Sequence, residues 1–237
     1  MNYKHLPAWL ERNQIFRTLF LFRKLFLLKK SFRHHSQFAE DISIALHFPK
    51  KAKGFFVDVG CFHPVKYNNT YRLYQKGWRG VNIDIDDIKI QGFKILRPGD
   101  TNVVCAVSNK PGEVNYWSNG FYSLTITLDE QFASGKPGYL KKKVNADTLT
   151  NILDATPYKD RTIDFLTVDA EGHDYQVLTS LDFDRYQPRL IAVETHKTTL
   201  DEVVKEDICQ YLTGKGYVIV NWVGLTLLFR REVPSPV

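Results

Sequence analysis

The stretch that decides the fold is Gly54-Phe55-Phe56-Val57-Asp58-Val59-Gly60-Cys61-Phe62-His63-Pro64. An apolar run enters it, an acidic residue lies near the end of that run, and a glycine turn follows. A short buried strand that ends at Asp-x-Gly and leads into helix-forming sequence builds a cofactor cleft at the carboxyl end of a strand. A second apolar run, residues 80–83, ends at Asp84, 26 residues after Asp58. This is near the spacing at which an acid after the second strand reaches the ribose of a nucleoside, so the sequence predicts an enzyme with an adenosine-containing cofactor.

Strand-like and helix-like segments alternate along most of the chain. Strands are expected at residues 55–59, 81–85, 103–107, 163–168 and 189–193, and helices at residues 37–47, 69–76, 87–96, 147–153, 172–181 and 200–212. Such alternation implies a parallel sheet with helices on both faces. Two final runs either side of Val223-Gly224 predict an antiparallel hairpin, while residues 111–143, rich in Ser, Thr, Gly and aromatic residues, are expected to form a loop. We therefore expect an α/β fold: the mostly parallel, Rossmann-like sheet of class I S-adenosylmethionine-dependent methyltransferases.

The basic character of the chain is confined to its start. The formal net charge is +6, but residues 1–35 hold eight Lys or Arg against one acid, which leaves the remainder nearly neutral. A nucleic-acid-binding surface on the body is therefore not expected. We expect a basic amphipathic helical extension at residues 1–50 and a methyltransferase domain at residues 51–237.

The extension is too often interrupted by cations to span a membrane, which takes about 20 apolar residues. In a helix, one face would carry the apolar side chains Ile15, Leu19, Phe22 and Phe26. Such a helix could lie on an anionic membrane through residues 1–35, or it could pack on the domain or on a second copy of the chain. A secretory signal fits poorly, because no small-residue cleavage site follows.

The three cysteines, Cys61, Cys105 and Cys209, are widely spaced. Their spacing favours free, buried thiols over a disulfide framework or a structural zinc site. We therefore expect a cytoplasmic protein, located at the inner face of the cytoplasmic membrane if the extension binds there.

Polar residues follow nearly every predicted strand. Ligands of a parallel sheet bind at the carboxyl ends of its strands, so these side chains are expected to meet at one site. The residues concerned are Asp58, Gly60, His63, Asp84, Ser108, Asp169, Glu171, Gly172, His173, Glu194, Thr195 and His196.

Several of these residues are expected to bind the cofactor. Asp84 should accept hydrogen bonds from both ribose hydroxyls. Asp58 should organise the first loop or meet the ammonium group of the cofactor, while Gly60 lets the backbone approach. Asn69 and Thr70 could cap the next helix and direct amide donors at the cofactor's carboxylate. The expected cofactor-binding set is Asp58, Gly60, Asn69, Thr70, Asp84, Ser108 and Asp169.

Two carboxylate–imidazole groups on neighbouring strands carry the expected catalysis. They comprise Asp169, Glu171 and His173 after one strand, and Glu194 and His196 after the next. A carboxylate or imidazole could act as general base toward an acceptor hydroxyl. Alternatively, Asp169, Glu194 and His196 could hold a divalent cation, Mg²⁺ or Mn²⁺, that binds a sugar diol and lowers its pKa. The spacing leaves both mechanisms open.

The chain resembles the FkbM-type methyltransferase family over roughly residues 54–230. The resemblance rests on an ordered set of motifs: Phe56-Val57-Asp58-Val59-Gly60 with His63-Pro64, Tyr67-Asn68-Asn69-Thr70, Leu73-Tyr74, residues 77–84 (GWRGVNID), residues 97–102 (RPGDTN), Ala106-Val107-Ser108, residues 166–173 (LTVDAEGH) and Val177-Leu178. The resemblance implies an S-adenosylmethionine-dependent enzyme that methylates a hydroxyl, often on a sugar of a bacterial glycan. Position by position, Asp58, Gly60 and Asp84 match the family's cofactor-site motif. Asp169, Glu171 and Gly172 match the family's acid-Glu-Gly motif.

The function that this resemblance implies is O-methylation of a sugar hydroxyl, in polysaccharide biosynthesis. Aromatic residues of the 111–143 segment, Tyr116, Trp117, Phe121 and Tyr122, could stack on the sugar acceptor. One alternative is an inactive methyltransferase-like protein that binds a glycan or a membrane. A nicotinamide-dependent oxidoreductase would need a full G-x-G-x-x-G after the first strand, of which only Gly60 is present.

Overall fold

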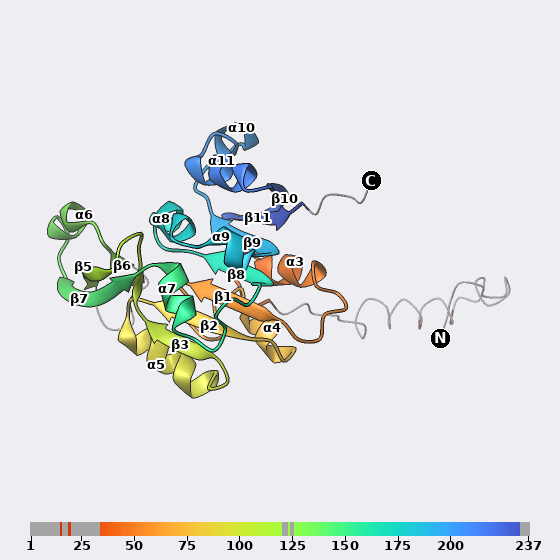
Figure 1. Cartoon of the computed structure of the whole chain (residues 1–237), viewed down its shortest axis with the longest axis horizontal. Coiled ribbons are helices and arrows are strands. Elements are labelled where there is room, and N and C mark those ends of the chain that lie inside the picture. Colours follow the sequence, from red (N-terminus) through yellow and green to blue (C-terminus); the bar gives the residue numbers. More distant parts are fainter. Residues whose placement is uncertain (1–14, 16–18, 20–33, 120–122, 124–125, 233–237) are drawn as a thin grey trace. The chain divides into compact units, whose positions relative to one another are not determined.

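The computed structural model describes Ile15, Leu19, residues 34–119, Ser123 and residues 126–232 (Figure 1). The chain divides into two units, Met1–Arg33 and His34–Val237. In the first unit the two described residues are helical with exposed side chains. The expected contact of residues 1–35 with a membrane or a second copy falls almost wholly outside the described residues and stays a prediction, as does the boundary at residue 50. Within the described part of the chain, no helix is long and apolar enough to cross a membrane.

Seven strands form the main sheet of the second unit, in the order β10-β11-β9-β8-β1-β2-β3. Five of them are parallel: β1 (Phe55–Val59), β2 (Arg79–Asp84), β3 (Thr101–Val104), β8 (Phe165–Val168) and β9 (Leu190–Glu194). β11 (Thr226–Arg231) is antiparallel to β9 and to the edge strand β10 (Tyr217–Val223). The expected parallel sheet and closing hairpin are confirmed. The strand order reverses at β1, and ligand clefts form at such a switch point.

Helices cover both faces of this sheet (Figure 1). Phe55, Val57 and Val59 of β1 enter the larger core, which α7 (Leu149–Asp154), α8 (Asp174–Thr179), α9 (Phe183–Tyr186), α10 (Leu200–Val203) and α11 (Asp207–Gly214) cover. Phe56 enters a second core, under α3 (Glu40–Leu46) and α4 (Tyr71–Gln75), and α5 (Asp87–Leu96) packs on β2 and β3. β1 is therefore buried on both sides, as its continuous apolar run indicates.

A second sheet replaces the expected loop at residues 111–143. Its strands are β4 (Ala106–Val107), β7 (Tyr139–Asp147), β5 (Gly112–Asn119) and β6 (Ile126–Thr127), in that spatial order, with α6 (Glu130–Ser134) between β6 and β7 in the chain. Val114, Tyr116 and Ser118 of β5 turn inward while Glu113 and Asn115 are exposed, so the segment has the period of two that defines a strand. The prediction of a loop here was wrong.

Two further predictions of single elements need correction. The expected strand at residues 103–107 is divided, because β3 belongs to the main sheet and β4 to the second sheet. The expected helix at residues 200–212 is two short helices, since Val203 ends α10 and Asp207 begins α11. The three cysteines are free and buried, as expected.

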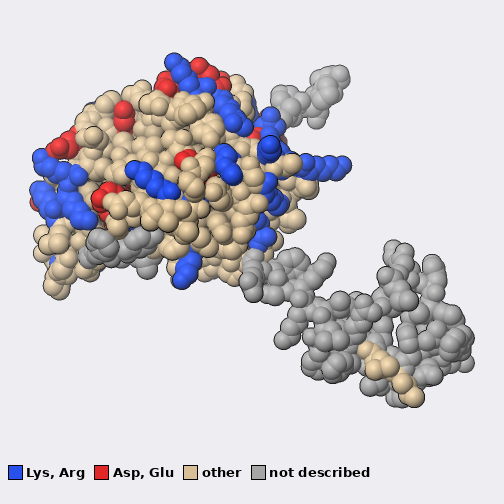
Figure 2. All heavy atoms as spheres, turned by 90° about the horizontal axis from the view of Figure 1, so that it is seen from below, with Lys and Arg blue, Asp and Glu red and all other residues tan. Residues whose placement is uncertain are grey.

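Charged side chains on the face shown in Figure 2 are interspersed with large uncharged areas. Basic and acidic side chains occur together on it, in keeping with the near-neutral charge of residues 36–237. The expectation that the body is not a nucleic-acid-binding surface stays a prediction.

A buried guanidinium connects the first strands to the loop before α4. Arg97 is fully buried, and its Nε donates to Asp100 at 2.8 Å. Its Nη1 donates to Asn68 Oδ1 at 3.2 Å and to Thr70 Oγ1 at 3.0 Å. The Thr70 hydroxyl and the Asn68 amide in turn donate to one oxygen of Asp58, at 2.7 and 3.2 Å. These five residues form the Arg97 network.

The network extends through Asp100 into the sheet. Asp100 accepts hydrogen bonds from the Gly80 amide at 3.1 Å and from Asn82 Nδ2 at 3.2 Å, both on β2. Burial raises the pKa of Asp58 to about 6, against the lowering effects of Arg97, Thr70 and Asn68. The RPGDTN motif of residues 97–102 therefore has a structural role, which is to position β1, β2 and the loop before α4.

We expect Arg97→Ala to lower the free energy of unfolding by about 3–5 kcal/mol, because it leaves carboxylates buried without their cation. Urea unfolding followed by circular dichroism measures this change. Arg185→Ala is the matched control, since Arg185 pairs with two aspartates in a partly exposed cluster near the surface. Exposed pairs contribute about 1 kcal/mol or less. An Arg97→Ala variant as stable as Arg185→Ala would contradict the structural role of the network.

Candidate functional site

A cavity of about 490 Å³ lies at the carboxyl ends of β1, β2, β8 and β9. Ile126 and Thr127 of β6, with Leu128, form one wall of it, so the second sheet helps to enclose the site. The volume is within the range of small-molecule sites, roughly 300–1,000 Å³. Six of the residues predicted at the strand ends line the cavity: Gly60, Asp84, Asp169, Glu171, His173 and Glu194.

Gly60 forms the turn after β1. Its φ of 75° lies in the left-handed region that favours glycine. A Cβ at this position would overlap the carbonyl oxygen of Asp169, so the missing side chain allows the turns after β1 and β8 to approach each other. The Gly60 and Cys61 amides donate to the Ile83 carbonyl at 2.9 and 3.2 Å. These contacts fix the turn against β2.

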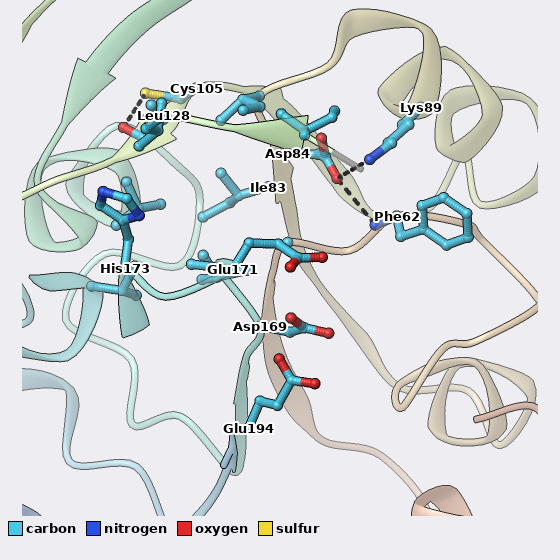
Figure 3. A pocket seen from close by; sticks show the side chains of 18 of the residues that line it. Phe62, Ile83, Asp84, Lys89, Cys105, Leu128, Asp169, Glu171, His173 and Glu194 are labelled. Carbon is cyan, nitrogen blue, oxygen red and sulfur yellow. Dashed lines mark hydrogen bonds and ion pairs between the residues drawn. The ribbon is translucent and has the colours of Figure 1, made fainter. Parts of the chain in front are cut away.

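Asp84 ends β2 and faces the cavity (Figure 3). Its Oδ2 accepts from the Phe62 amide at 3.1 Å, and its Oδ1 accepts from the Asp86 amide at 2.9 Å. Burial raises the pKa of Asp84, and the nearby ammonium of Lys89 is the strongest effect that lowers it. Each carboxylate oxygen keeps a lone pair, so Asp84 can accept further hydrogen bonds from a ligand.

Lys89 is a cavity residue that the sequence analysis missed. Its Nζ lies 3.8 Å from Asp84 Oδ2 and 4.9 Å from the centre of the Phe62 ring. Lys89 is the third residue of α5, and helical side chains point toward the N-terminus of their helix, here back to the end of β2. The signal was therefore present in the sequence, as a lysine in the first turn of the helix that follows Asp84.

Three carboxyl groups lie in a row along one side of the cavity: Glu171, Asp169 and Glu194 (Figure 3). The carboxyl groups of Asp169 and Glu194 lie next to each other in this row. The side chain of Asp169 is exposed where it opens onto the cavity. Desolvation by the protein around it, followed by the charge of the neighbouring Glu194 carboxylate, raises the pKa of Asp169 well above its usual value, and desolvation also raises the pKa of Glu194. The pair therefore retains a proton more readily than an ordinary carboxyl group does, which suits acid–base chemistry.

Non-glycine residues in the left-handed region surround the site. They are Phe62 (φ 47°), Tyr67 (φ 51°) and Glu171 (φ 49°), and all three line the cavity. Such conformations cost about 1–3 kcal/mol each and persist where neighbouring structure enforces them, often at functional sites. Burial, followed by the charge of Glu194, raises the pKa of Glu171.

The two histidines of the expected catalytic set lie apart. His173, at the start of α8, lines the cavity on a different side from the Asp169–Glu194 pair (Figure 3). His196 is largely exposed, and its Nε2 lies 3.6 Å from Glu194 Oε2. Among the described residues, no group of three or more His, Cys, Asp or Glu is placed to hold a metal ion. The expected metal ligands Asp169, Glu194 and His196 thus do not form such a group.

Two of the expected cofactor ligands lie in the Arg97 network. Asp58 bonds to Thr70 and Asn68, so it organises the loop, which was the first of its two expected roles. The Thr70 amide is bonded to Asn68 Oδ1, and the Thr70 side chain is fully buried. The expected direction of this amide toward a ligand is therefore not observed. His63 Nδ1 accepts two backbone amides at 3.0 Å and shapes its own turn.

Two other expected ligands lie beside the large cavity. Asn69 donates to Thr167 Oγ1 at 3.2 Å and lines a small neighbouring cavity. Ser108 follows β4, and its amide donates to the Asp147 carbonyl at 2.9 Å. The three residues before Ser108, Cys105, Ala106 and Val107, line the large cavity instead. Burial raises the pKa of Cys105 to about 11, so this wall is uncharged.

Residues 58–219 match the model of a family described as the methyltransferase FkbM domain. No curated protein matches the chain. Similar solved structures include a TehB-like SAM-dependent methyltransferase from Corynebacterium glutamicum, at 11% sequence identity over 96% of this chain and 100% of that chain. A precorrin-6y C5,15-methyltransferase from Geobacter metallireducens is 10% identical over 86% of this chain and 96% of that chain, and the METTL16 methyltransferase domain is 13% identical over 98% and 99%. The TM-score is 0.42 for each of the three.

Gly60→Ala should lower the melting temperature more than Gly216→Ala does. Both glycines have positive φ, which costs a non-glycine residue about 1–2 kcal/mol. Only at Gly60 would the added methyl group also collide with a described backbone atom, because a Cβ at Gly216 meets open space within the described residues. Differential scanning calorimetry measures both variants. An equal decrease in melting temperature in the two variants would contradict the close approach of Gly60 to Asp169.

Proposed function

The chain belongs to the FkbM methyltransferase family, and we propose that it transfers a methyl group from S-adenosyl-L-methionine to a sugar hydroxyl. The acceptor would be a sugar of a bacterial surface glycan or a related glycoconjugate. One observation carries the proposal: a cavity lined by carboxyl groups lies at the point where the strand order reverses. Family membership supports methyl transfer, and the adjacent carboxyl groups of Asp169 and Glu194, whose pKa values are raised, support a hydroxyl as the acceptor.

The charges of the cavity suit a cationic cofactor. Four carboxyl groups line it, those of Asp84, Asp169, Glu171 and Glu194, with the ammonium of Lys89 among them. Even when one proton is shared by the pair, the negative charges outnumber the positive one. S-adenosylmethionine carries a sulfonium and an ammonium group against one carboxylate, so its net charge is opposite to that of the cavity. The residues present therefore fit this cofactor.

The adenosine part fits the end of β2. Asp84 would accept hydrogen bonds from the ribose hydroxyls through its remaining lone pairs. An apolar wall beside it suits the adenine ring, and consists of Ile83, Ile85, Cys105, Ala106 and Val107. Asp58 lies in the Arg97 network and would act on the cofactor only through the loop that it organises.

The Asp169–Glu194 pair would act as the general base. Bound S-adenosylmethionine supplies an electrophilic methyl group. The methyl group would pass to the acceptor oxygen with S-adenosylhomocysteine as the leaving group, and the ionised member of the pair would accept the hydroxyl proton. A carboxylate with a raised pKa is a better proton acceptor near neutral pH than an ordinary one. Glu171, His173 and His196 stay predictions as further catalytic groups.

Asp84→Ala should weaken S-adenosylmethionine binding by about tenfold or more, because two hydrogen bonds to a charged acceptor are lost. Isothermal titration calorimetry with S-adenosylmethionine and S-adenosylhomocysteine measures this. Asp87→Ala is the matched control, since Asp87 is an exposed aspartate of the neighbouring helix turn. Unaltered affinity in Asp84→Ala would show that Asp84 does not bind the ribose.

Glu194→Gln should lower kcat by about 10²-fold or more, the usual contribution of a general base. When the pH falls below the raised pKa, the pair is protonated and can no longer act as a base. Wild-type activity should therefore decrease, on the acid side, at a pH above the pKa of an ordinary carboxyl group. Removing Glu194 also removes a charge that raises the pKa of Asp169, and the residual activity should therefore fall at a lower pH. The assay follows a labelled methyl group into a bacterial surface-glycan fraction.

Glu113→Gln, at an exposed glutamate, is the control for this experiment and should keep the wild-type profile. A pH profile that does not shift in Glu194→Gln would contradict the effect of the Glu194 charge on the pKa of Asp169. Turnover that stops with EDTA and returns with Mg²⁺ would favour the metal mechanism. Label in protein or nucleic acid instead of glycan would contradict the proposed acceptor.

A further inference from the structure

A second, polar cavity of about 40 Å³ adjoins the large one beside the Asp169–Glu194 pair. Four residues line both cavities: Gln37, Tyr67, Asp169 and Glu194. The residues that line only the small cavity are Glu40, Asn69, Thr167, Val168, Leu225 and Thr226. The proposed base therefore lies at the junction of two spaces, of which the larger suits the cofactor.

Part of this junction comes from outside the family-matched region, residues 58–219. Gln37 and Glu40 precede that region, and Leu225 and Thr226 of the closing hairpin follow it. The wall beside the base is thus built partly by segments that the family model does not cover. A residue of these segments that selects the acceptor can therefore differ from other family members without any change in the residues that bind the cofactor and transfer the methyl group.

The segment that carries Gln37 is firmly held. The Phe38 ring lies against Gly224 of the hairpin turn, where any side chain would collide with it. The Phe38 amide donates to Glu40 Oε2 at 2.7 Å, and the His35 carbonyl accepts from the Asn68 amide at 3.1 Å. Arg72 of α4 further pairs with the buried Asp41 at 3.0 Å. The Gln37 backbone is therefore positioned by contacts on both sides.

Gln37 and Tyr67 bring the chemistry that binds a sugar ring. Both side chains are exposed at the cavity, and Tyr67 is held in the left-handed region with its ring 6.2 Å from that of Phe62. An aromatic face packs against the apolar C–H face of a sugar, and an amide can donate to and accept from hydroxyls. The carboxyl groups of Glu40, Asp169 and Glu194 on the same wall would repel an anion.

We propose that Gln37 and Tyr67 form the acceptor subsite at this junction and select a neutral sugar over an anionic one. The sugar ring packs on Tyr67, a ring hydroxyl is hydrogen-bonded to the Gln37 amide, and the hydroxyl to be methylated lies at the Asp169–Glu194 pair. This inference rests on the proposed methyl transfer, whose acceptor class it narrows.

The test uses the full chain saturated with S-adenosylhomocysteine and two probes, a neutral methyl hexopyranoside and a hexuronate. Saturation-transfer NMR titrations should show binding of the neutral glycoside, with about tenfold weaker binding in Gln37→Ala and in Tyr67→Ala. Tyr67→Phe, which keeps the ring, should retain binding. Gln210→Ala and Tyr175→Ala, at exposed positions on α11 and α8, should match the wild type. The hexuronate should bind at least about tenfold more weakly than the glycoside.

Three results would overturn the subsite: no binding of the neutral glycoside, unaltered binding in both alanine variants, or equal binding of the hexuronate. Thermal melting of each variant shows whether the fold is retained, and Tyr67→Phe keeps the test decisive if Tyr67→Ala unfolds. Calorimetry with S-adenosylhomocysteine separates the two levels of inference. A wild-type chain that does not bind it contradicts the proposed function itself, whereas normal binding with an unaffected acceptor titration contradicts only the subsite.

Discussion

A guanidinium that is removed from water needs acceptors, and Arg97 finds them for its Nε and Nη1 by drawing three parts of the chain together, while its Nη2 has no hydrogen-bond partner among the described residues. It is fully buried, paired with Asp100 and bonded to Asn68 and Thr70. Aromatic rings cover its faces, those of Phe56, Tyr74 and Phe93, at about 5 Å. Such a charge is costly without every partner. The loop before α4 consequently has little freedom, and Asn69 within it is placed against Thr167 of β8.

This rigidity explains how the site keeps its strained backbone. Tyr67 immediately precedes the Arg97 network in the chain, and Phe62 donates its amide to Asp84. A left-handed tyrosine or phenylalanine costs free energy that only well-anchored neighbours can offset. The network and the β2 end provide those anchors from both sides. The cavity is thus formed before any ligand arrives, which lowers the ordering cost of binding.

The sequence predicts the main sheet well, because short apolar runs that end in acids have few other interpretations. It leaves two roles open for Asp58, in the loop or at the cofactor, because Asp58 lies near the end of its run much as Asp84 lies at the end of the next. The parallel register pairs Asp58 with Asn82, so Asp84 lies two residues nearer the carboxyl edge than Asp58 does. One acid is therefore inside the sheet and the other at its edge, and only the strand register reveals this. The second sheet escaped prediction for a related reason: β6 has two residues, and its pairing with β5 depends on tertiary contacts.

Strand register also explains why the carboxyl groups that follow β8 and β9 are neighbours. Val168 of β8 lies beside Val193 of β9, so the residues that follow, Asp169 and Glu194, are neighbours across the two strands. Adjacent parallel strands are about 4.8 Å apart, which brings the two carboxyl groups within hydrogen-bonding reach. At that separation two negative charges repel strongly, and retaining one proton relieves the repulsion. His196 lies two residues further along the chain, in solvent beside Glu194. Register alone therefore brings the two carboxyl groups together, and a metal site would require a third ligand to converge on them.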